Sequence, residues 1–235
     1  DIKGFDARYK LVILTYLITG QWLTPEQITL EGIDHLELAD FEYARRMGRE
    51  IKLIANLRLF EQGTQVYVLP LMIKKDEMLA KISGSTNAVT LSGKYSEDIT
   101  LIGKGAGSLP TASAIVSDLN KVLRHPEPFP PPPITAELVL ESMENIRFRH
   151  TLRFEVRDHP GIFGHIGSIF ERHSINIYAL EQLPQYHRIG KEGEEIVIFT
   201  LTIQDCVEGL VIKALKEINQ AEYMLKPVVL LREIV

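Results

Sequence analysis

The segment from His125 to Pro133, which contains six prolines, constrains the fold of this chain more than any other stretch. Proline has a fixed φ and no backbone N–H, so this segment forms neither a helix nor a central strand. It favours polyproline II, which serves as a semi-rigid spacer or as a ligand for a proline-binding partner. Because globular patterns lie on both sides, we interpret it as a linker. The predicted parts are residues 1–124, 125–146 and 147–235.

The composition is that of a soluble globular protein and excludes several classes. Of the 235 residues, 45% are hydrophobic and 24% are charged, which is enough apolar material for two ordinary domains. No Lys/Arg-rich run is present, so no nucleic-acid partner is expected. The apolar runs are too short to span a bilayer, so no membrane association is expected either. A single cysteine, Cys206, excludes an internal disulfide framework and favours the reducing cytoplasm.

The first part has an α+β pattern. Helical spacing predicts a helix over Asp6–Thr19, with Asp6 as its N-cap. Its predicted apolar stripe consists of Leu11, Leu14, Leu17 and Ile18. After Glu50 the apolar residues indicate strands, which we expect to form an antiparallel or mixed sheet. The predicted strands are Ile51–Phe60, Gln65–Leu71, Ser83–Leu91 and Ile99–Gly103.

The last part has the order βαββαβ, which predicts a ferredoxin-like fold. Its first strand, Arg147–Arg157, alternates between apolar and charged residues and is therefore predicted to be half-exposed. The elements predicted after it are a helix from Ile162, strands over Ser174–Leu183 and Glu195–Gln204, a helix over Val207–Ile218 and a strand over Met224–Arg232.

Two stretches of the first part carry candidate chemistry. Asp1, Asp6 and Lys10 lie around a turn at Gly4, and Asp6 and Lys10 share a helix face because they are four residues apart. The group is either a polar cluster that binds a substrate and moves a proton, or a helix cap with a surface ion pair. Residues 103–107 form a glycine-rich turn between a strand and a helix. Such a turn either accepts a flat or anionic ligand or is merely tight, and it does not have the Rossmann spacing.

Both stretches resemble the homoserine dehydrogenase family. The positions that match its signature at the start of the chain are Asp1, Ile2, Gly4, Asp6 and Lys10. The resemblance implies that Asp1 and Asp6 bind substrate and that Lys10 is the proton donor and acceptor. The implied reaction is the NAD(P)-dependent interconversion of L-homoserine and L-aspartate 4-semialdehyde, in threonine and methionine biosynthesis.

A second family motif runs from Gly103 to Asp118, and it implies that the turn lies beside the nicotinamide end of NAD or NADP. The implied cofactor-binding residues are Gly103, Gly105 and Gly107. Glu31-Gly32-Ile33 and Asn87-Ala88 also match family positions. In the family, the helix after the turn packs on the nucleotide-binding domain.

The first half of the signature and the nucleotide-binding domain would precede Asp1, and the chain begins with aspartate rather than methionine. We therefore expect a processed or truncated chain that does not transfer hydride alone. The alternative is a non-catalytic, amino-acid-binding and oligomerising regulatory module derived from the same family.

The last part resembles an ACT domain, because Asp158-x-Pro-Gly161 follows the first strand and Asn176 precedes the second. The resemblance implies that Asp158, Gly161 and Asn176 surround an amino-acid ligand, threonine or a similar molecule, in a homodimer or homotetramer. Each residue alone also fits a cap or a turn. Three histidines lie nearby, but no zinc spacing fits them, and no metal is expected. They are His159, His165 and His173.

Overall fold

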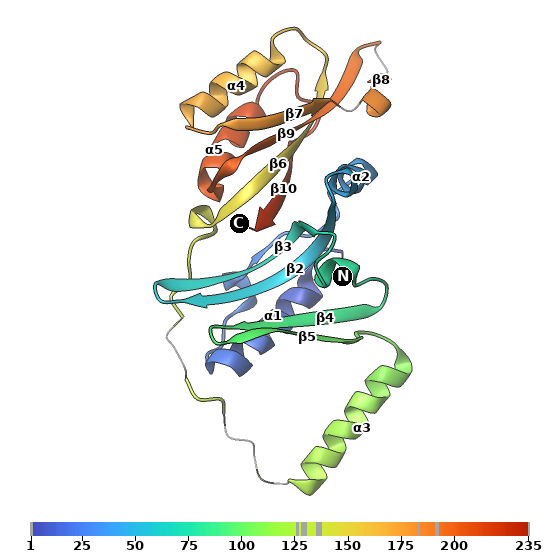
Figure 1. Cartoon of the computed structure of the whole chain (residues 1–235), viewed down its shortest axis with the longest axis vertical. Helices are drawn as coiled ribbons and strands as arrows, with labels where there is room; N and C mark the ends of the chain where they lie inside the picture. Colours follow the sequence, from blue (N-terminus) through green and yellow to red (C-terminus); the bar gives the residue numbers. More distant parts are fainter. Residues whose placement is uncertain are drawn as a thin grey trace.

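The computed structural model describes residues 2–125, 127, 131–134, 138–182, 184–190 and 193–234. The two halves of the chain lie one above the other along the long axis, and helix α3 extends from the lower end (Figure 1). None of the helices in the described part of the chain is long and apolar enough to cross a membrane.

The first half is built around a long antiparallel hairpin. Strands β2 (Arg49–Phe60) and β3 (Gly63–Lys74) pair along their whole length, from Arg49 opposite Lys74 to Phe60 opposite Gly63. This confirms the predicted hairpin. The other elements of this half are α1 (Phe5–Thr19), β1 (Thr29–Leu30), α2 (Leu38–Arg46), β4 (Thr86–Gly93), β5 (Ser96–Lys104) and α3 (Ser108–Arg124), with short 3-10 helices at Pro25–Gln27 and Leu79–Lys81.

Helix α1 packs on the hairpin through a face that differs from the predicted one. Leu17 and Ile18 are 58% and 42% exposed, whereas Thr15 and Thr19 are buried. The threonine hydroxyls can be buried because each donates to the carbonyl four residues before it. Apolar residues surround the helix on most sides, so hydropathy alone did not identify the buried face. That face consists of Leu11, Val12, Thr15 and Thr19.

The second half confirms the predicted βαββαβ order. Its sheet has the order β10-β6-β9-β7, and α4 and α5 cover one face of it (Figure 1). The elements are β6 (Arg147–Arg157), α4 (Ile162–Arg172), β7 (Ile177–Gln182), β8 (Arg188–Ile189), β9 (Glu195–Val207), α5 (Glu208–Ile218) and β10 (Val229–Ile234), with 3-10 helices at Met143–Asn145 and Pro184–Tyr186.

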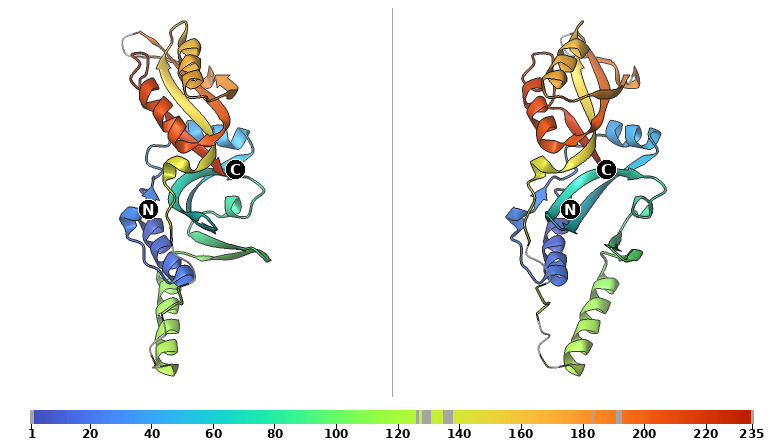
Figure 2. Two further views of the ribbon diagram at one scale, coloured as in Figure 1. Left: turned by 90° about the vertical axis from the view of Figure 1, so that its left-hand side faces the viewer. Right: turned by 60° about the vertical axis from the view of Figure 1, so that its left-hand side comes forward.

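The sheets of the two halves are joined at β10 and β3. The pairing is parallel, with Arg232 opposite Leu71, so one eight-stranded sheet crosses the boundary (Figure 2). Aromatic side chains also pack across the boundary between the halves, where the rings of Tyr67 and Phe148 meet edge to face with centroids 5.8 Å apart. The two halves therefore share apolar cores as well as a sheet.

Strand β6 is buried on both faces, so the prediction of a half-exposed strand is wrong. The side chains of Arg153 and Glu155 point away from α4 and α5, yet they are only 2% and 4% exposed. Helix α2, from the other half of the chain, covers this second face; its Tyr43 packs with Ile198 of β9. The alternation of apolar and charged residues along a strand shows that its two faces differ. It does not show whether a helix from elsewhere in the chain covers the polar face.

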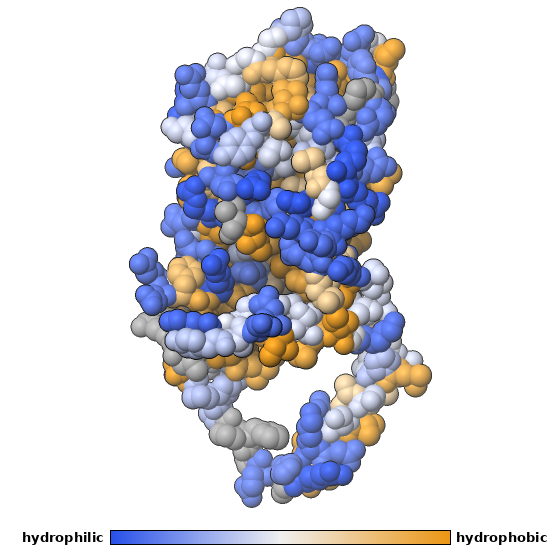
Figure 3. Space-filling view, in the orientation of Figure 1, coloured by the Kyte–Doolittle hydropathy of each residue, from blue (hydrophilic) through white to orange (hydrophobic). Residues whose placement is uncertain are grey.

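The β4–β5 hairpin and α3 carry apolar side chains that are exposed to solvent in this chain. The hairpin forms a separate two-stranded sheet, and α3 has no buried residue, although the helix itself was predicted correctly. Figure 3 shows hydrophobic side chains along α3 and along the lower rim of the molecule above it. The exposed apolar residues of α3 are Leu109, Ile115, Val116, Leu119, Val122 and Leu123.

Candidate functional site

The first turn of α1 is organised by Gly4. This residue has φ +78°, and it is the N-cap, so the helix begins at Phe5. Asp6 lies in the first turn instead of at the cap, and its predicted capping role is wrong. Gly4 takes the cap because its backbone adopts a left-handed conformation against the sheet, where a Cβ would lie 2.7 Å from Cδ1 of Leu30. A carboxylate in the first turn also interacts favourably with the helix dipole.

Asp6 and Lys10 form an ion pair that faces solvent. The Lys10 Nζ donates to Oδ2 of Asp6 at 2.7 Å, and the two side chains are 51% and 56% exposed. Both charges are therefore accessible to a small molecule while each orients the other. Asp1, the third predicted member of the cluster, lies outside the described residues.

The glycine-rich turn lies between β5 and α3. Gly103 has open space where a Cβ would be, and Gly107 has φ +126° at the N-cap of α3. Gly105 is held differently, because its N–H donates to the Ser85 carbonyl at 2.9 Å and a Cβ would lie 2.0 Å from Nδ2 of Asn87. The turn thus presents bare backbone at the start of a 17-residue helix. This arrangement fits the approach of a flat, anionic ligand.

No described hydrogen bond or ion pair joins this turn to Asp6 or Lys10. Helix α1 and the β4–β5 hairpin lie on different sides of β2 and β3 in both views of Figure 2. The two predicted parts of the site therefore sit on separate elements, with solvent-facing groups on each.

The three predicted residues of the second half lie at both ends of α4. Gly161 has φ +94° and is the N-cap of the helix, just after Asp158. Asn176 follows the other end and donates from Nδ2 to Oε1 of Gln204 at 2.9 Å. Helix α4 has 11 residues and is therefore about 16 Å long. One subunit thus does not bring Asp158 and Gly161 next to Asn176.

Asn176 lines a cavity of about 390 Å³ at the carboxyl end of α4. Its other lining residues are Gly167, Glu171, Ser174, Ile175 and Ile177. Two of the nearby histidines have other partners: Nδ1 of His165 lies 2.9 Å from the Tyr223 hydroxyl, and Nε2 of His173 lies 3.6 Å from Oε2 of Glu217. Across the described residues, no three potential ligands among His, Cys, Asp and Glu are grouped as a metal site requires.

Sequence reasoning missed two buried charge pairs, one between the two halves and one inside the second half. Arg153 of β6 donates from Nε and Nη2 to both carboxylate oxygens of Asp40 in α2, at 2.6 and 3.1 Å. Arg232 of β10 similarly donates to Glu208 at the start of α5. Charged residues on the predicted outward face of β6 were a signal for such pairs, but the sequence did not indicate their partners.

Fold and site together define a class of protein, in which an α+β unit that presents a carboxylate–ammonium pair is joined to a ferredoxin-like βαββαβ unit. Residues 1–119 match the homoserine dehydrogenase family and residues 150–220 match the ACT domain. The chain belongs to the homoserine dehydrogenase family, and its second half contains an ACT domain.

Individual relatives agree over nearly the whole chain. The homoserine dehydrogenase of Neisseria gonorrhoeae is 32% identical over 242 residues, which cover 99% of this chain and 54% of that protein. The Helicobacter pylori enzyme is 32% identical over 96% of this chain and 52% of its own length. The crystal structure of a homoserine dehydrogenase from Thiobacillus denitrificans superposes with a TM-score of 0.82 at 31% identity, covering 99% of this chain and 53% of that one. The chain thus spans about half the length of these relatives.

Proposed function

We propose that this chain supplies the substrate-binding and regulatory parts of an NAD(P)-dependent homoserine dehydrogenase, which interconverts L-homoserine and L-aspartate 4-semialdehyde. The observation that carries the proposal is the solvent-facing Lys10–Asp6 pair on the first turns of α1, in a chain of this family. The predicted division into residues 1–124, 125–146 and 147–235 is part of the same proposal.

The side chains can move one proton. When the aldehyde is reduced, its carbonyl oxygen gains negative charge, and the Lys10 ammonium stabilises that charge and then donates a proton to it. In the reverse direction the neutral Lys10 amine accepts the hydroxyl proton of homoserine. Asp6 holds Nζ at 2.7 Å and thereby fixes its position. We assign the substrate ammonium to Asp6 and Asp1, since carboxylates are its natural partners.

NAD or NADP would supply or accept the hydride when bound. We assign Gly103, Gly105 and Gly107 to its binding, because bare backbone at the start of α3 suits a flat, anionic molecule. The exposed apolar face of α3 needs a partner surface. A nucleotide-binding domain or a second subunit would cover it.

We propose that the ACT domain binds threonine or a similar amino acid between two copies of the chain, in a homodimer or homotetramer. Asp158 and Gly161 at one end of α4, and Asn176 at the other, could meet only across such an interface. We also propose a cytoplasmic location, because a chain with the single cysteine Cys206 has no internal disulfide framework.

A second candidate is a non-catalytic regulatory module of the same family. The observation in its favour is the ACT domain match over residues 150–220, where Asn176 lines a cavity of about 390 Å³. This module would bind an amino acid at the same ACT site but would not catalyse the reaction. Homoserine dehydrogenase activity therefore distinguishes the two candidates.

The test is an assay of L-homoserine oxidation with NAD and with NADP, on the protein as its gene encodes it. The proposal expects reduced cofactor to form with homoserine and not with L-serine, which lacks one methylene. A folded protein without homoserine activity, whose melting temperature still rises with threonine, would favour the regulatory module. No rise with threonine or related amino acids would contradict the proposed amino-acid ligand of the ACT domain.

A further inference from the structure

Arg232 of β10 is the centre of a buried chain of charges. Its Nε and Nη2 donate to Oε1 of Glu208 at 2.9 and 2.7 Å, and Oε2 of Glu208 lies 2.8 Å from Nε2 of His150. All three side chains are at most 5% exposed. On this side, Arg232 lies in the interior of the ACT domain, where Glu208 is its partner.

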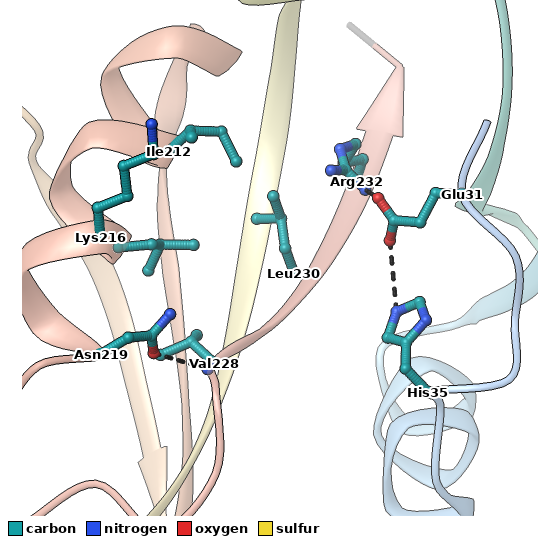
Figure 4. A pocket seen from close by; sticks show the side chains of 9 residues that line it. Glu31, His35, Ile212, Lys216, Asn219, Val228, Leu230 and Arg232 are labelled. Carbon is teal, nitrogen blue, oxygen red and sulfur yellow. Dashed lines mark hydrogen bonds and ion pairs between the residues drawn. The ribbon is translucent and has the colours of Figure 1, made fainter. Parts of the chain in front are cut away.

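The other side of Arg232 faces the first half of the chain. Its Nη1 forms an ion pair with Oε2 of Glu31 at 2.9 Å, and Oε1 of Glu31 lies 3.3 Å from Nε2 of His35 (Figure 4). These groups border a cavity of about 330 Å³, whose opposite wall includes Leu215 and Lys216 of α5. Glu31 is therefore reachable from solvent, whereas Glu208 is sealed.

Burial alone would lower the pKa of Arg232, but the carboxylates of Glu208 and Glu31 outweigh it, so the pKa is raised above its ordinary value. The guanidinium thus stays charged at all relevant pH values and is held by both carboxylates. A planar guanidinium group that is bound by two carboxylates has little freedom to move.

Glu31 is the first residue of the segment 31–33, which packs against the turn before α1. The Ile33 N–H donates to the Ile2 carbonyl at 2.9 Å. Gly32 lies so close to the same turn that a Cβ would be 2.7 Å from the Ile2 carbonyl oxygen and 2.7 Å from Cα of Lys3. Residues 2 and 3 lead directly into Gly4 and the turns that carry Asp6 and Lys10. A displacement of the backbone at Glu31 and Gly32 would therefore press on that turn, because these contacts leave no free space.

We infer that Arg232 is a positioning residue for the Asp6–Lys10 pair, acting through Glu31 and the contact of Gly32 and Ile33 with Ile2. The last strand of the ACT domain thereby sets the placement of the proposed catalytic turn, which gives a ligand on the ACT domain a physical route to it. The inference deepens the proposed function and rests on it for its catalytic consequence, whereas the structural link itself does not depend on activity.

The link is tested first by amide hydrogen exchange on the full chain. Glu31→Gln breaks the ion pair at its solvent-reachable end and leaves Arg232 with Glu208. We expect amides of residues 5–10 to exchange about tenfold faster, while those of β9 stay unchanged. Arg232→Met leaves Glu208 buried without its cation and is expected to destabilise the fold, so Glu31→Gln is the decisive variant.

The matched control is Arg49→Met. Arg49 of β2 also joins the first half to β10, through Glu233 at 2.7 Å, one residue beyond Arg232. Its loss should weaken the same boundary without reaching Ile2. Equal exchange of residues 5–10 in the two variants would overturn the inference. So would a uniform rise that includes β9 in Glu31→Gln, because Glu31 would then have only a general role in stability.

The kinetic arm uses the same variants in the homoserine assay. Glu31→Gln should lower kcat about tenfold with the KM for NAD(P) unchanged, since the cofactor turn lies elsewhere, and Arg49→Met should leave kcat unchanged. Unchanged kcat in Glu31→Gln would contradict the catalytic consequence. If the wild-type protein has no homoserine activity, the proposed function fails, and the exchange experiment still decides whether the link exists.

Discussion

The Lys10–Asp6 and Arg153–Asp40 pairs are made of the same kinds of charge but lie in opposite surroundings. The first is more than half exposed on both sides, whereas the second is 2% and 0% exposed. Exposed pairs contribute at most about 1 kcal/mol to stability, and their charges remain free to engage a ligand. Buried pairs compensate each other and become necessary to the fold, because removing one partner leaves an isolated charge. The exposed pair agrees with the chemistry that we propose for Lys10 and Asp6, whereas the buried pair holds α2 against β6.

Arg153→Met should have the largest effect on stability. It leaves the buried Asp40 carboxylate of α2 without its cation, so we expect the free energy of unfolding to fall by about 3–5 kcal/mol. Urea unfolding measures this change. Lys121→Met is the control, since Lys121 pairs with Asp118 on exposed α3 and should matter little. Equal losses in the two variants would remove the distinction between buried and exposed pairs.

Asp6→Asn should separate activity from stability. The amide keeps the size of the side chain but loses the charge that holds Lys10, so we expect homoserine turnover to drop by about 10²-fold. The unfolding free energy should change by less than about 1 kcal/mol. Steady-state kinetics and urea unfolding on one preparation give both values. A large loss of stability with normal turnover would reverse the assignment.

Acid should weaken the buried charge cluster inside the second half. Burial raises the pKa of Glu208, but the His150 hydrogen bond and the Arg232 guanidinium outweigh it, and the folded-state pKa lies below its ordinary 4.5. Such a group stabilises the fold above pH 4.5, and that contribution is lost as the pH falls through the folded-state pKa. Unfolding free energy should therefore decrease below pH 4.5, and it should decrease less in Glu208→Gln. Equal slopes in both proteins would exclude Glu208 as a cause.

Leu119→Gln should have the smallest effect. Leu119 is 58% exposed on α3, so the unfolding free energy of this chain should change by less than about 0.5 kcal/mol. The control Leu152→Ala, at a position with 0% exposure in the ACT domain, should cost about 2–5 kcal/mol. A large cost at Leu119, with the chain monomeric, would mean that α3 packs within its own chain.

The sequence predicted those elements whose pattern is local. The β2–β3 hairpin and the βαββαβ order followed from apolar periodicity, and the bounds of β6 agree with its alternation. The Lys10–Asp6 pair followed from a spacing of four along a helix. The family motifs pointed to Glu31 without indicating its partner.

The remaining features depend on residues far apart in the chain. The polar face of β6 is buried because Asp40, 113 residues from Arg153, brings α2 onto it. The cap of α1 is Gly4 and not Asp6, because the backbone there has φ +78° and packs against Leu30 of β1, which favours glycine. Thr15 rather than Leu17 lies on the face of α1 that packs against β2 and β3, which come much later in the chain. None of these contacts has a local signature.

The most direct test of the account is the rate of homoserine oxidation by Lys10→Met, measured beside the wild-type protein on the protein as its gene encodes it. Without its proton donor and acceptor, kcat should fall by about 10²–10⁴-fold. Because Lys10 is about half exposed, the melting temperature should stay nearly unchanged. Wild-type turnover in a folded Lys10→Met protein would contradict the account.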